Sequence, residues 1–142
     1  MPNRWPGWFN PKPISFETIS FGPFNRCRRV TSDGNVVIVP TPGHTPGHVS
    51  VIVVDGNISH FLAGDTSYTQ QFLVEKKVDG VSPSVALSMR TIQTILRYAQ
   101  DSPTVYLPAH DPESAKRLET VETIKLDGNL PGNNCSIGTH GP

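Results

Sequence analysis

The sequence predicts an α+β protein in which a β-meander is followed by a helix, a strand and a second helix. Short runs of β-branched residues in the first half are separated by Asp-Gly pairs, which are typical of hairpin turns. From about residue 83 the apolar residues recur at helical spacing instead. The 142-residue chain is long enough for one domain with a hydrophobic core, and its 12 glycines and 14 prolines predict many loops.

The first half of the chain is predicted to be built from strands. The segment 14–22 forms one strand or a bent pair of short strands, and Asp33-Gly34 marks a hairpin turn after it. The three strands of the meander follow at 36–39, 49–54 and 58–63. A loop rich in proline and glycine separates the first two of them, and Asp55-Gly56 is the turn before the third.

The second half is predicted to contain two helices around one short strand. Ser82 is the expected N-cap of a helix over 83–100, with Pro83 as its first residue. Its apolar face would carry Val85, Ile92, Ile95, Leu96 and Ala99. A strand at 104–107 follows, and then an amphipathic helix over 112–124. The apolar side of this second helix would carry Ala115, Leu118 and Val121.

The two ends of the chain differ from its middle. Residues 1–13 contain four prolines, which exclude regular structure, so we interpret them as a connector from an N-terminal half that this sequence lacks. The aromatic side chains of this connector need an apolar surface to pack against: Trp5, Trp8 and Phe9. Residues 14–124 would form a partial domain. Residues 125–142 have no periodic apolar pattern, and we expect them to be disordered.

Composition and charge exclude several classes of function. The formal net charge is zero, so no long-range field would attract nucleic acid or an anionic membrane. The cluster Arg26, Arg28 and Arg29 is interpreted as a solvated loop or strand edge. Cys27 and Cys135 lie too far apart in sequence to suggest a disulfide framework, which favours a reducing, cytoplasmic location. No signal peptide is visible, and the longest apolar run is too short to span a bilayer.

The loop Thr41-Pro42-Gly43-His44-Thr45-Pro46-Gly47-His48 is the first candidate functional segment. Two Pro-Gly pairs make it rigid, and a rigid loop can hold one imidazole in a fixed direction, as metal binding requires. A turn with an incidental histidine is the alternative for this loop alone. His48 begins the next strand, and we expect it to pack or form hydrogen bonds rather than bind a metal.

Two further candidates also stand where a strand ends. Asp65 follows the strand at 58–63, and a carboxylate there can bridge two cations through its two oxygens. The alternative for Asp65 is a turn or a helix cap. His110 follows the strand at 104–107, and Asp111 is the expected N-cap of the helix after it. Together His44, Asp65 and His110 predict a metal site at the ends of three strands.

The segments TPGHTPGHVSV, LAGDTSYT and LPAHD resemble the metallo-β-lactamase-fold hydrolases, and within them the N-acyl-homoserine lactonase branch. The resemblance covers roughly residues 10–120. It implies part of an αββα four-layer sandwich with two zinc ions, or other divalent metals, at one edge of its sheets. His44 would then bind one metal, Asp65 would bridge both, and His110 would bind the second. Tyr68 matches a tyrosine that contacts the substrate carbonyl in that branch, although it could instead simply cover the core.

The sequence departs from this family at one motif. The family signature His-x-His-x-Asp-His, which supplies three ligands and the aspartate that assists the chemistry, does not occur. In the family it lies N-terminal to the segment that resembles residues 1–13, so the chain looks like the C-terminal half of such an enzyme. We therefore expect weak binding of a single metal and little hydrolysis by this chain alone.

Three functions remain open at this stage. The first is hydrolysis of a small-molecule ester or lactone C–O bond by metal-activated water, with this chain supplying part of the centre. The second is hydrolysis of a thioester or a β-lactam by the same fold. The third is an inactive fragment or a partner-binding module. Without the other half, an apolar sheet face and unpaired edge strands would be exposed, which predicts self-association or a complementing N-terminal half.

Overall fold

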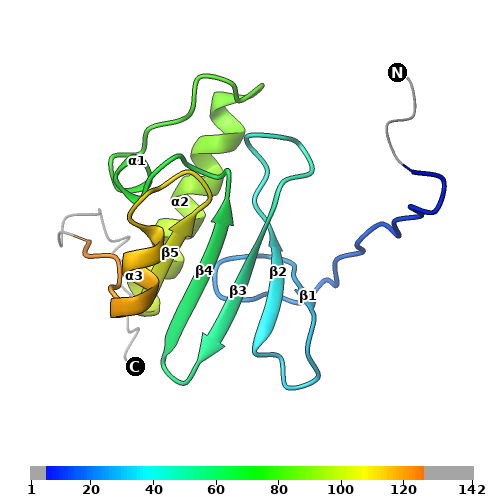
Figure 1. Cartoon of the computed structure of the whole chain (residues 1–142), viewed down its shortest axis with the longest axis horizontal. Helices are drawn as coiled ribbons and strands as arrows, with labels where there is room; N and C mark the ends of the chain where they lie inside the picture. The colour runs from blue at the N-terminus through cyan, green and yellow to red at the C-terminus, as the bar shows by residue number, and fades with distance from the viewer. Residues whose placement is uncertain (1–5, 127–142) are drawn as a thin grey trace, which may run out of the picture.

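The computed structural model describes residues 6–126. One mixed sheet has long helix α2 on one face, with two shorter helices near its β5 side (Figure 1). The strands are β1 (Arg28–Arg29), β2 (Val36–Pro40), β3 (Val49–Asp55), β4 (Ile58–Gly64) and β5 (Thr104–Pro108). The helices are α1 (Gln70–Val74), α2 (Val85–Asp101) and α3 (Ser114–Thr120). No helix of this described part is long and apolar enough to cross a membrane.

The sheet confirms the predicted meander. Its strand order is β1-β2-β3-β4-β5, with antiparallel pairs up to β4 and a parallel pair between β4 and β5. The three predicted strands of the meander and the predicted strand at 104–107 are all present, and each is one residue longer at its C-terminal end. The basic cluster lies partly on β1, whose two arginines are exposed at the sheet edge, as predicted.

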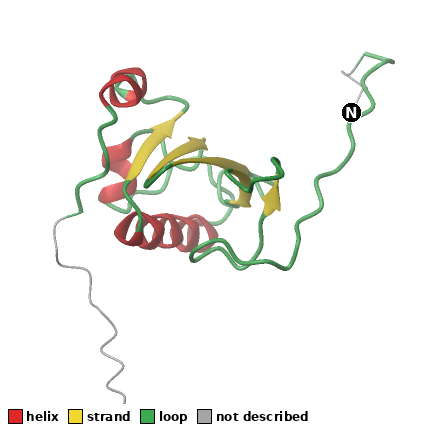
Figure 2. Cartoon of the chain, turned by 90° about the horizontal axis from the view of Figure 1, so that it is seen from below, coloured by secondary structure: helices red, strands yellow, loops and turns green. Residues whose placement is uncertain are grey.

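The core forms between one face of the sheet and α2 (Figure 2). A row of paired residues crosses the four longer strands, and its members are at most 1% exposed: Val37, Ile52, Phe61 and Tyr106. Because side chains alternate along a strand, every second residue joins this face. From α2, the predicted Ile92, Ile95 and Leu96 pack against it.

The opposite face of the sheet is also apolar. One row of paired residues on it is Val36, Val53, His60 and Val105, and the next is Ile38, Val51, Leu62 and Leu107. In the second row every member is at least partly exposed, and Leu62 is 44% exposed. Within the described chain this face therefore remains partly open to solvent on β2, β3 and β4. We refer to these two rows as the open face.

Helix α2 begins two residues later than predicted. Its N-cap is Ser84, whose hydroxyl accepts a hydrogen bond from the N–H of Leu87 at 3.3 Å. Ser82, the predicted cap, instead donates its backbone N–H to Asp79. This shift leaves Val85 at the first turn of the helix, where it is 62% exposed rather than part of the core.

Helix α3 also differs from its prediction. It is shorter than 112–124, and its N-cap is Glu113 rather than Asp111. The residue that it buries is Arg117, whereas Leu118 and Val121 are exposed. The apolar pattern was misleading because α3 docks on β5 through polar contacts.

These polar contacts protect the edge of the sheet. Three outward carbonyl oxygens of β5 accept hydrogen bonds from the chain that follows: Thr104 from the Ile124 N–H, Tyr106 from Arg117 Nε, and Pro108 from the Ser114 hydroxyl. An edge strand whose carbonyls are occupied is a poor template for pairing with another chain. In the described sheet β5 has no strand partner on its outer side, as expected, but these carbonyls are not free to pair with another chain.

The remaining segments are less regular. Residues 14–22 form no strand, only isolated bridges from Glu17 to Cys27 and from Phe21 to Phe24, so this prediction was wrong. Helix α1 was not predicted. The connector 6–13 runs away from the sheet, and Trp8 is 81% exposed (Figure 1). Trp5 and the predicted disorder from residue 127 onward lie outside the described residues.

Candidate metal centre

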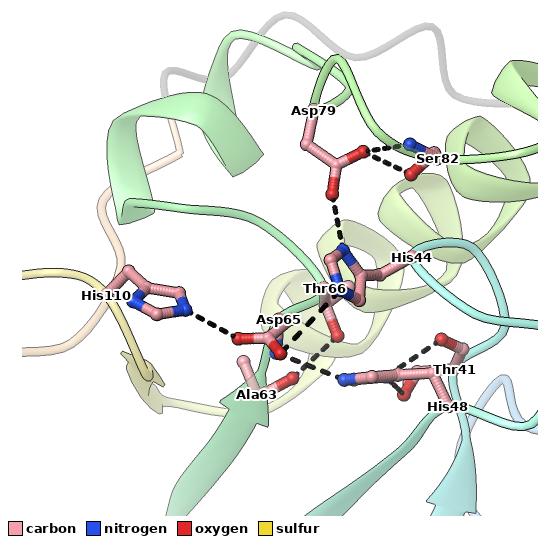
Figure 3. A network of polar contacts seen from close by, with 9 residues as sticks. All are labelled: Thr41, His44, His48, Ala63, Asp65, Thr66, Asp79, Ser82 and His110. Carbon is pink, nitrogen blue, oxygen red and sulfur yellow. Dashed lines mark hydrogen bonds and ion pairs between the residues drawn. The ribbon is translucent and has the colours of Figure 1, made fainter. Parts of the chain in front are cut away.

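The sheet topology brings the three predicted ligand residues to one edge. Strands β2 and β4 both run antiparallel to β3, and β5 runs parallel to β4. The C-terminal ends of β2, β4 and β5 therefore lie at the same edge of the sheet. His44 follows β2, Asp65 follows β4 and His110 follows β5, so their side chains meet there (Figure 3).

Asp65 lies between the two histidines. Its Oδ1 is 3.2 Å from His110 Nε2, and its Oδ2 is 3.9 Å from His44 Nε2. Each carboxylate oxygen thus faces a different imidazole nitrogen. The side chains of His44 and Asp65 are about one third exposed, while that of His110 is 64% exposed, so the cluster opens to solvent.

The loop that carries His44 is anchored on α2. The carbonyl of Pro42 accepts a hydrogen bond from the Thr91 hydroxyl at 2.5 Å. Gly43 packs so closely on Ser88 that a Cβ there would lie 2.8 Å from the serine hydroxyl oxygen. Both contacts restrict the loop from the helix side, which explains how a long connection can hold one imidazole in place.

His48 positions the backbone of Asp65. The backbone N–H of Asp65 donates to His48 Nε2 at 3.0 Å, so in the neutral ring Nδ1 carries the proton and donates to the Thr41 carbonyl oxygen at 3.1 Å. Burial lowers the pKa of His48, which favours this neutral state. The predicted hydrogen-bonding role of His48 is present. Gly64 makes the approach possible, because it has a positive φ of 58° and a Cβ there would lie 2.9 Å from His48 Nε2.

Asp79 is a member of the cluster that sequence reasoning missed. Its Oδ2 accepts a hydrogen bond from His44 Nδ1 at 2.8 Å, and its side chain is only 3% exposed. Its Oδ1 accepts from both the backbone N–H and the hydroxyl of Ser82. Burial opposes the ionisation of Asp79, but these hydrogen bonds outweigh it and hold the pKa of the carboxyl below its ordinary value. The spacing from Asp79 to Ser82 suggests a turn, but no local signal points to a histidine 35 residues away.

Tyr68 lies beside the cluster, next to His110. The rings of Tyr68 and His110 meet edge to face with their centroids 6.0 Å apart. The Tyr68 ring also packs against Phe72, with a centroid distance of 6.2 Å. Tyr68 is half-buried. Its position is compatible with contact to a substrate near His110, and equally with the covering role, so both interpretations of this residue stay predictions.

The donor set fits part of a two-ion site. Imidazole nitrogen and carboxylate oxygen are ordinary zinc ligands, and two ligands of one tetrahedral ion lie about 3.4 Å apart. The pair His110–Asp65 at 3.2 Å matches this spacing, and the pair His44–Asp65 at 3.9 Å is wider. Each ion position would have two side-chain ligands, fewer than the three of a usual catalytic zinc. Accordingly, residues 6–126 contain no group of three or more His, Cys, Asp or Glu arranged to hold a metal by themselves.

Comparison with known proteins points to one group of enzymes, although no protein-family model matches the chain. The sequence is 33% identical over 86 residues to the N-acyl homoserine lactonase AttM of Rhizobium radiobacter, which is 60% of this chain and 33% of AttM. The AttM lactonase of Azorhizobium caulinodans is 28% identical over the same length. The chain thus spans about a third of the length of the curated relatives that it matches.

Solved structures agree with this assignment. An N-acyl homoserine lactone hydrolase with the product N-hexanoyl-L-homoserine bound at its catalytic metal centre matches with a TM-score of 0.54 and 26% identity, over 63% of this chain and 35% of that enzyme. A quorum-quenching N-acyl homoserine lactone lactonase matches with a TM-score of 0.50 and 28% identity, over 58% of this chain and 34% of that enzyme. This chain is therefore related to the N-acyl homoserine lactonases and has part of their metallo-β-lactamase fold.

Proposed function

We propose that this chain supplies one part of the metal centre of a lactonase-like hydrolase. The observation that carries the proposal is the Asp65 carboxylate, whose two oxygens each face one imidazole, His44 on one side and His110 on the other. A carboxylate with this arrangement is suited to bridging two divalent cations. Among the possible substrates, a lactone is favoured over a thioester or β-lactam by the relatives, which are lactonases.

In this proposal some residues bind the metal ions, and Tyr68 stabilises the charge that develops on the substrate. Bound divalent ions would activate water and polarise the substrate carbonyl. His44, Asp65 and His110 would hold those ions, and zinc is the first candidate because it takes nitrogen and oxygen ligands. Tyr68 would donate its phenol hydrogen to the oxygen that gains negative charge as the ester or lactone opens. Without further ligands, His44, Asp65 and His110 would bind metal ions only weakly.

Zinc titration of the chain by calorimetry tests this proposal. We expect weak binding, with an affinity well short of sub-micromolar, because each proposed position has only two protein ligands. Lactone hydrolysis should be close to the rate in buffer with zinc alone. Binding of two zinc ions with sub-micromolar affinity would show that the described residues make a complete site, and no heat of binding at millimolar zinc would refute the proposed function.

A complementing chain is the second part of the proposal. The open face presents two rows that are aliphatic except for His60, and Leu62 in one of them is 44% exposed. The AttM relatives have two thirds of their length outside the match, which is the material that could cover this face and supply further ligands. We propose that the partner is such a segment, which we expect to be the N-terminal half, rather than a second copy of the chain.

Co-expression with the unmatched part of AttM should therefore restore hydrolysis of an N-acyl homoserine lactone. Complex formation can be followed by co-purification and activity by lactone opening at constant pH. Val51→Lys places a charge on the open face and should prevent the complex, whereas Glu119→Lys on the exposed side of α3 should leave it intact. A stable dimer of this chain that excludes the partner would contradict the proposal and favour self-association.

Tyr68→Phe in the restored complex separates the two interpretations of this residue. Phenylalanine keeps the ring contacts with His110 and Phe72 but removes the hydroxyl. If the phenol stabilises the developing charge, kcat should fall by on the order of 10²-fold, with a much smaller change in KM. If Tyr68 only covers the core, kcat and thermal stability should both stay at the wild-type level.

A further inference from the structure

Asp79 uses its two carboxylate oxygens for two different tasks. One oxygen, Oδ1, accepts the backbone N–H of Ser82 at 2.8 Å and also its hydroxyl, which closes the turn before α2. The other oxygen, Oδ2, accepts from His44 Nδ1 at 2.8 Å. The turn needs only the first oxygen. The second oxygen connects the segment before α2 to His44, which lies 35 residues earlier in the loop after β2.

The contact with Asp79 determines which nitrogen of His44 carries a proton. An ionised carboxylate can only accept hydrogen bonds, so His44 Nδ1 must be the donor. In the neutral ring the lone pair then belongs to Nε2, and Nε2 is the atom that faces Asp65 Oδ2 at 3.9 Å. The buried aspartate therefore presents the free nitrogen of His44 to the same carboxylate that His110 approaches from the other side (Figure 3).

We propose that Asp79 is a positioning residue for the metal centre, acting through His44. It would hold the imidazole in the tautomer and direction that leave Nε2 free to bind a cation. This inference rests on the proposed function, because His44 must be a ligand for its tautomer to matter. Metal-bound histidines commonly donate their second nitrogen to a carboxylate, and the loss of that partner typically weakens metal binding 10- to 100-fold.

Asp79→Asn is a sharp test because its orientation can be foreseen. The backbone N–H of Ser82 requires an acceptor, so the amide oxygen of the asparagine should face Ser82. Its NH₂ group then points at His44 and donates to Nδ1, which moves the proton of the neutral ring to Nε2. The side chain keeps its size and the turn keeps its hydrogen bond, while the nitrogen that should bind the metal is blocked.

The tautomer can be measured in the metal-free protein. Nitrogen-15 NMR of the histidine rings at about pH 8.5, where an ordinary imidazole is neutral, should show Nδ1–H for His44 in the wild type and Nε2–H in Asp79→Asn. Zinc affinity measured by calorimetry should fall roughly 10- to 100-fold in the same variant. The matched control is Asp33→Asn, an exposed aspartate that also accepts a backbone N–H in a turn but contacts no histidine. It should change neither readout.

Three results would overturn the inference, and they differ from one another. An Nε2–H tautomer in the wild type would refute the positioning role directly. Unchanged tautomer and zinc affinity in Asp79→Asn would reduce Asp79 to a turn residue, while the proposed function would stand because the wild type still binds zinc. No zinc binding by the wild type at all would refute the proposed function first, and the role of Asp79 in the metal centre with it.

Discussion

Asp65→Asn should remove measurable zinc binding from the chain. Among the described residues, Asp65 is the side chain that lies beside both histidines, at 3.2 Å from His110 and 3.9 Å from His44, so its loss should affect both proposed ion positions at once. Asparagine has nearly the same shape, but it carries no charge and offers one acceptor oxygen instead of two. Because the wild-type site is already short of ligands, we expect the affinity to fall by more than about 100-fold, beyond the range expected for a residue that acts only through a ligand.

Single histidine variants provide the comparison for this result. His44→Gln and His110→Gln would each remove one proposed ligand from one proposed ion position, so each should weaken zinc binding less than Asp65→Asn does. Asp55→Asn is the matched control, because Asp55 is exposed and lies at the C-terminal end of β3, the opposite end of the sheet from the cluster. Calorimetric titration of the four variants would contradict the bridging role if Asp65→Asn retained the affinity of Asp55→Asn.

Much of the strand structure could be predicted because its signals are local. The runs 36–39 and 49–54 are short, rich in β-branched residues and followed by turn residues. Their positions therefore follow from the sequence itself. The prediction was wrong at 14–22, where the chain forms only isolated bridges. This segment has an apolar pattern but no long neighbouring strand to pair with, and pairing is a tertiary property.

The clustering of the three proposed ligand residues could be predicted in the same way. His44, Asp65 and His110 each follow a strand, and the strand directions then bring them to one edge. Asp79 could not be predicted because its contact with His44 depends on how the segment between α1 and α2 folds back over the site. A different contact of Asp79 explains the wrong helix start, because Ser82 donates its backbone N–H to Asp79 and the cap passes to Ser84.

Helix α3 packs on the sheet through Arg117 and not through the predicted apolar residues, so we expect loss of Arg117 to reduce stability strongly. Arg117 is 7% exposed, and its guanidinium binds Asp111 Oδ2 at 2.5 Å and the Tyr106 carbonyl at 3.2 Å. Asp111 in turn accepts the backbone N–H groups of Gln70 and Glu113. The buried ion pair of Arg117 and Asp111 therefore joins α3 to β5 and to the start of α1. Asp111 is the residue directly after His110.

Arg117→Met should lower the free energy of unfolding by about 3–5 kcal/mol. Methionine retains much of the aliphatic packing, but it leaves the Asp111 carboxylate buried without its cation and the Tyr106 carbonyl without a donor. Urea unfolding followed by circular dichroism measures the change. Lys116→Met is the matched control on the same helix, since Lys116 is exposed, and it should stay within about 0.5 kcal/mol of the wild type.

The pH dependence of the free energy of unfolding should identify the Arg117–Asp111 ion pair as the cause of this loss of stability. Burial opposes the ionisation of Asp111, but the hydrogen bonds from Gln70, Glu113 and Arg117 outweigh it, so the pKa of this carboxyl is below its ordinary value in the folded chain. A carboxyl with a lowered pKa stabilises the fold above about pH 4 and loses this contribution as the pH falls through its folded pKa. The difference between wild type and Arg117→Met should therefore narrow from neutral pH to about pH 3.

Arg117→Lys keeps the experiment informative if the methionine variant is too unstable to fold. Lysine retains the positive charge near Asp111 but lacks the planar guanidinium that reaches Asp111 and the Tyr106 carbonyl together. Its loss of stability should lie between those of Lys116→Met and Arg117→Met. Equal stability of Arg117→Met and Lys116→Met at neutral pH would mean that the ion pair contributes nothing net to stability. The Ser114 hydrogen bond would then hold α3 on β5, and the Ile124 hydrogen bond would hold the segment after it.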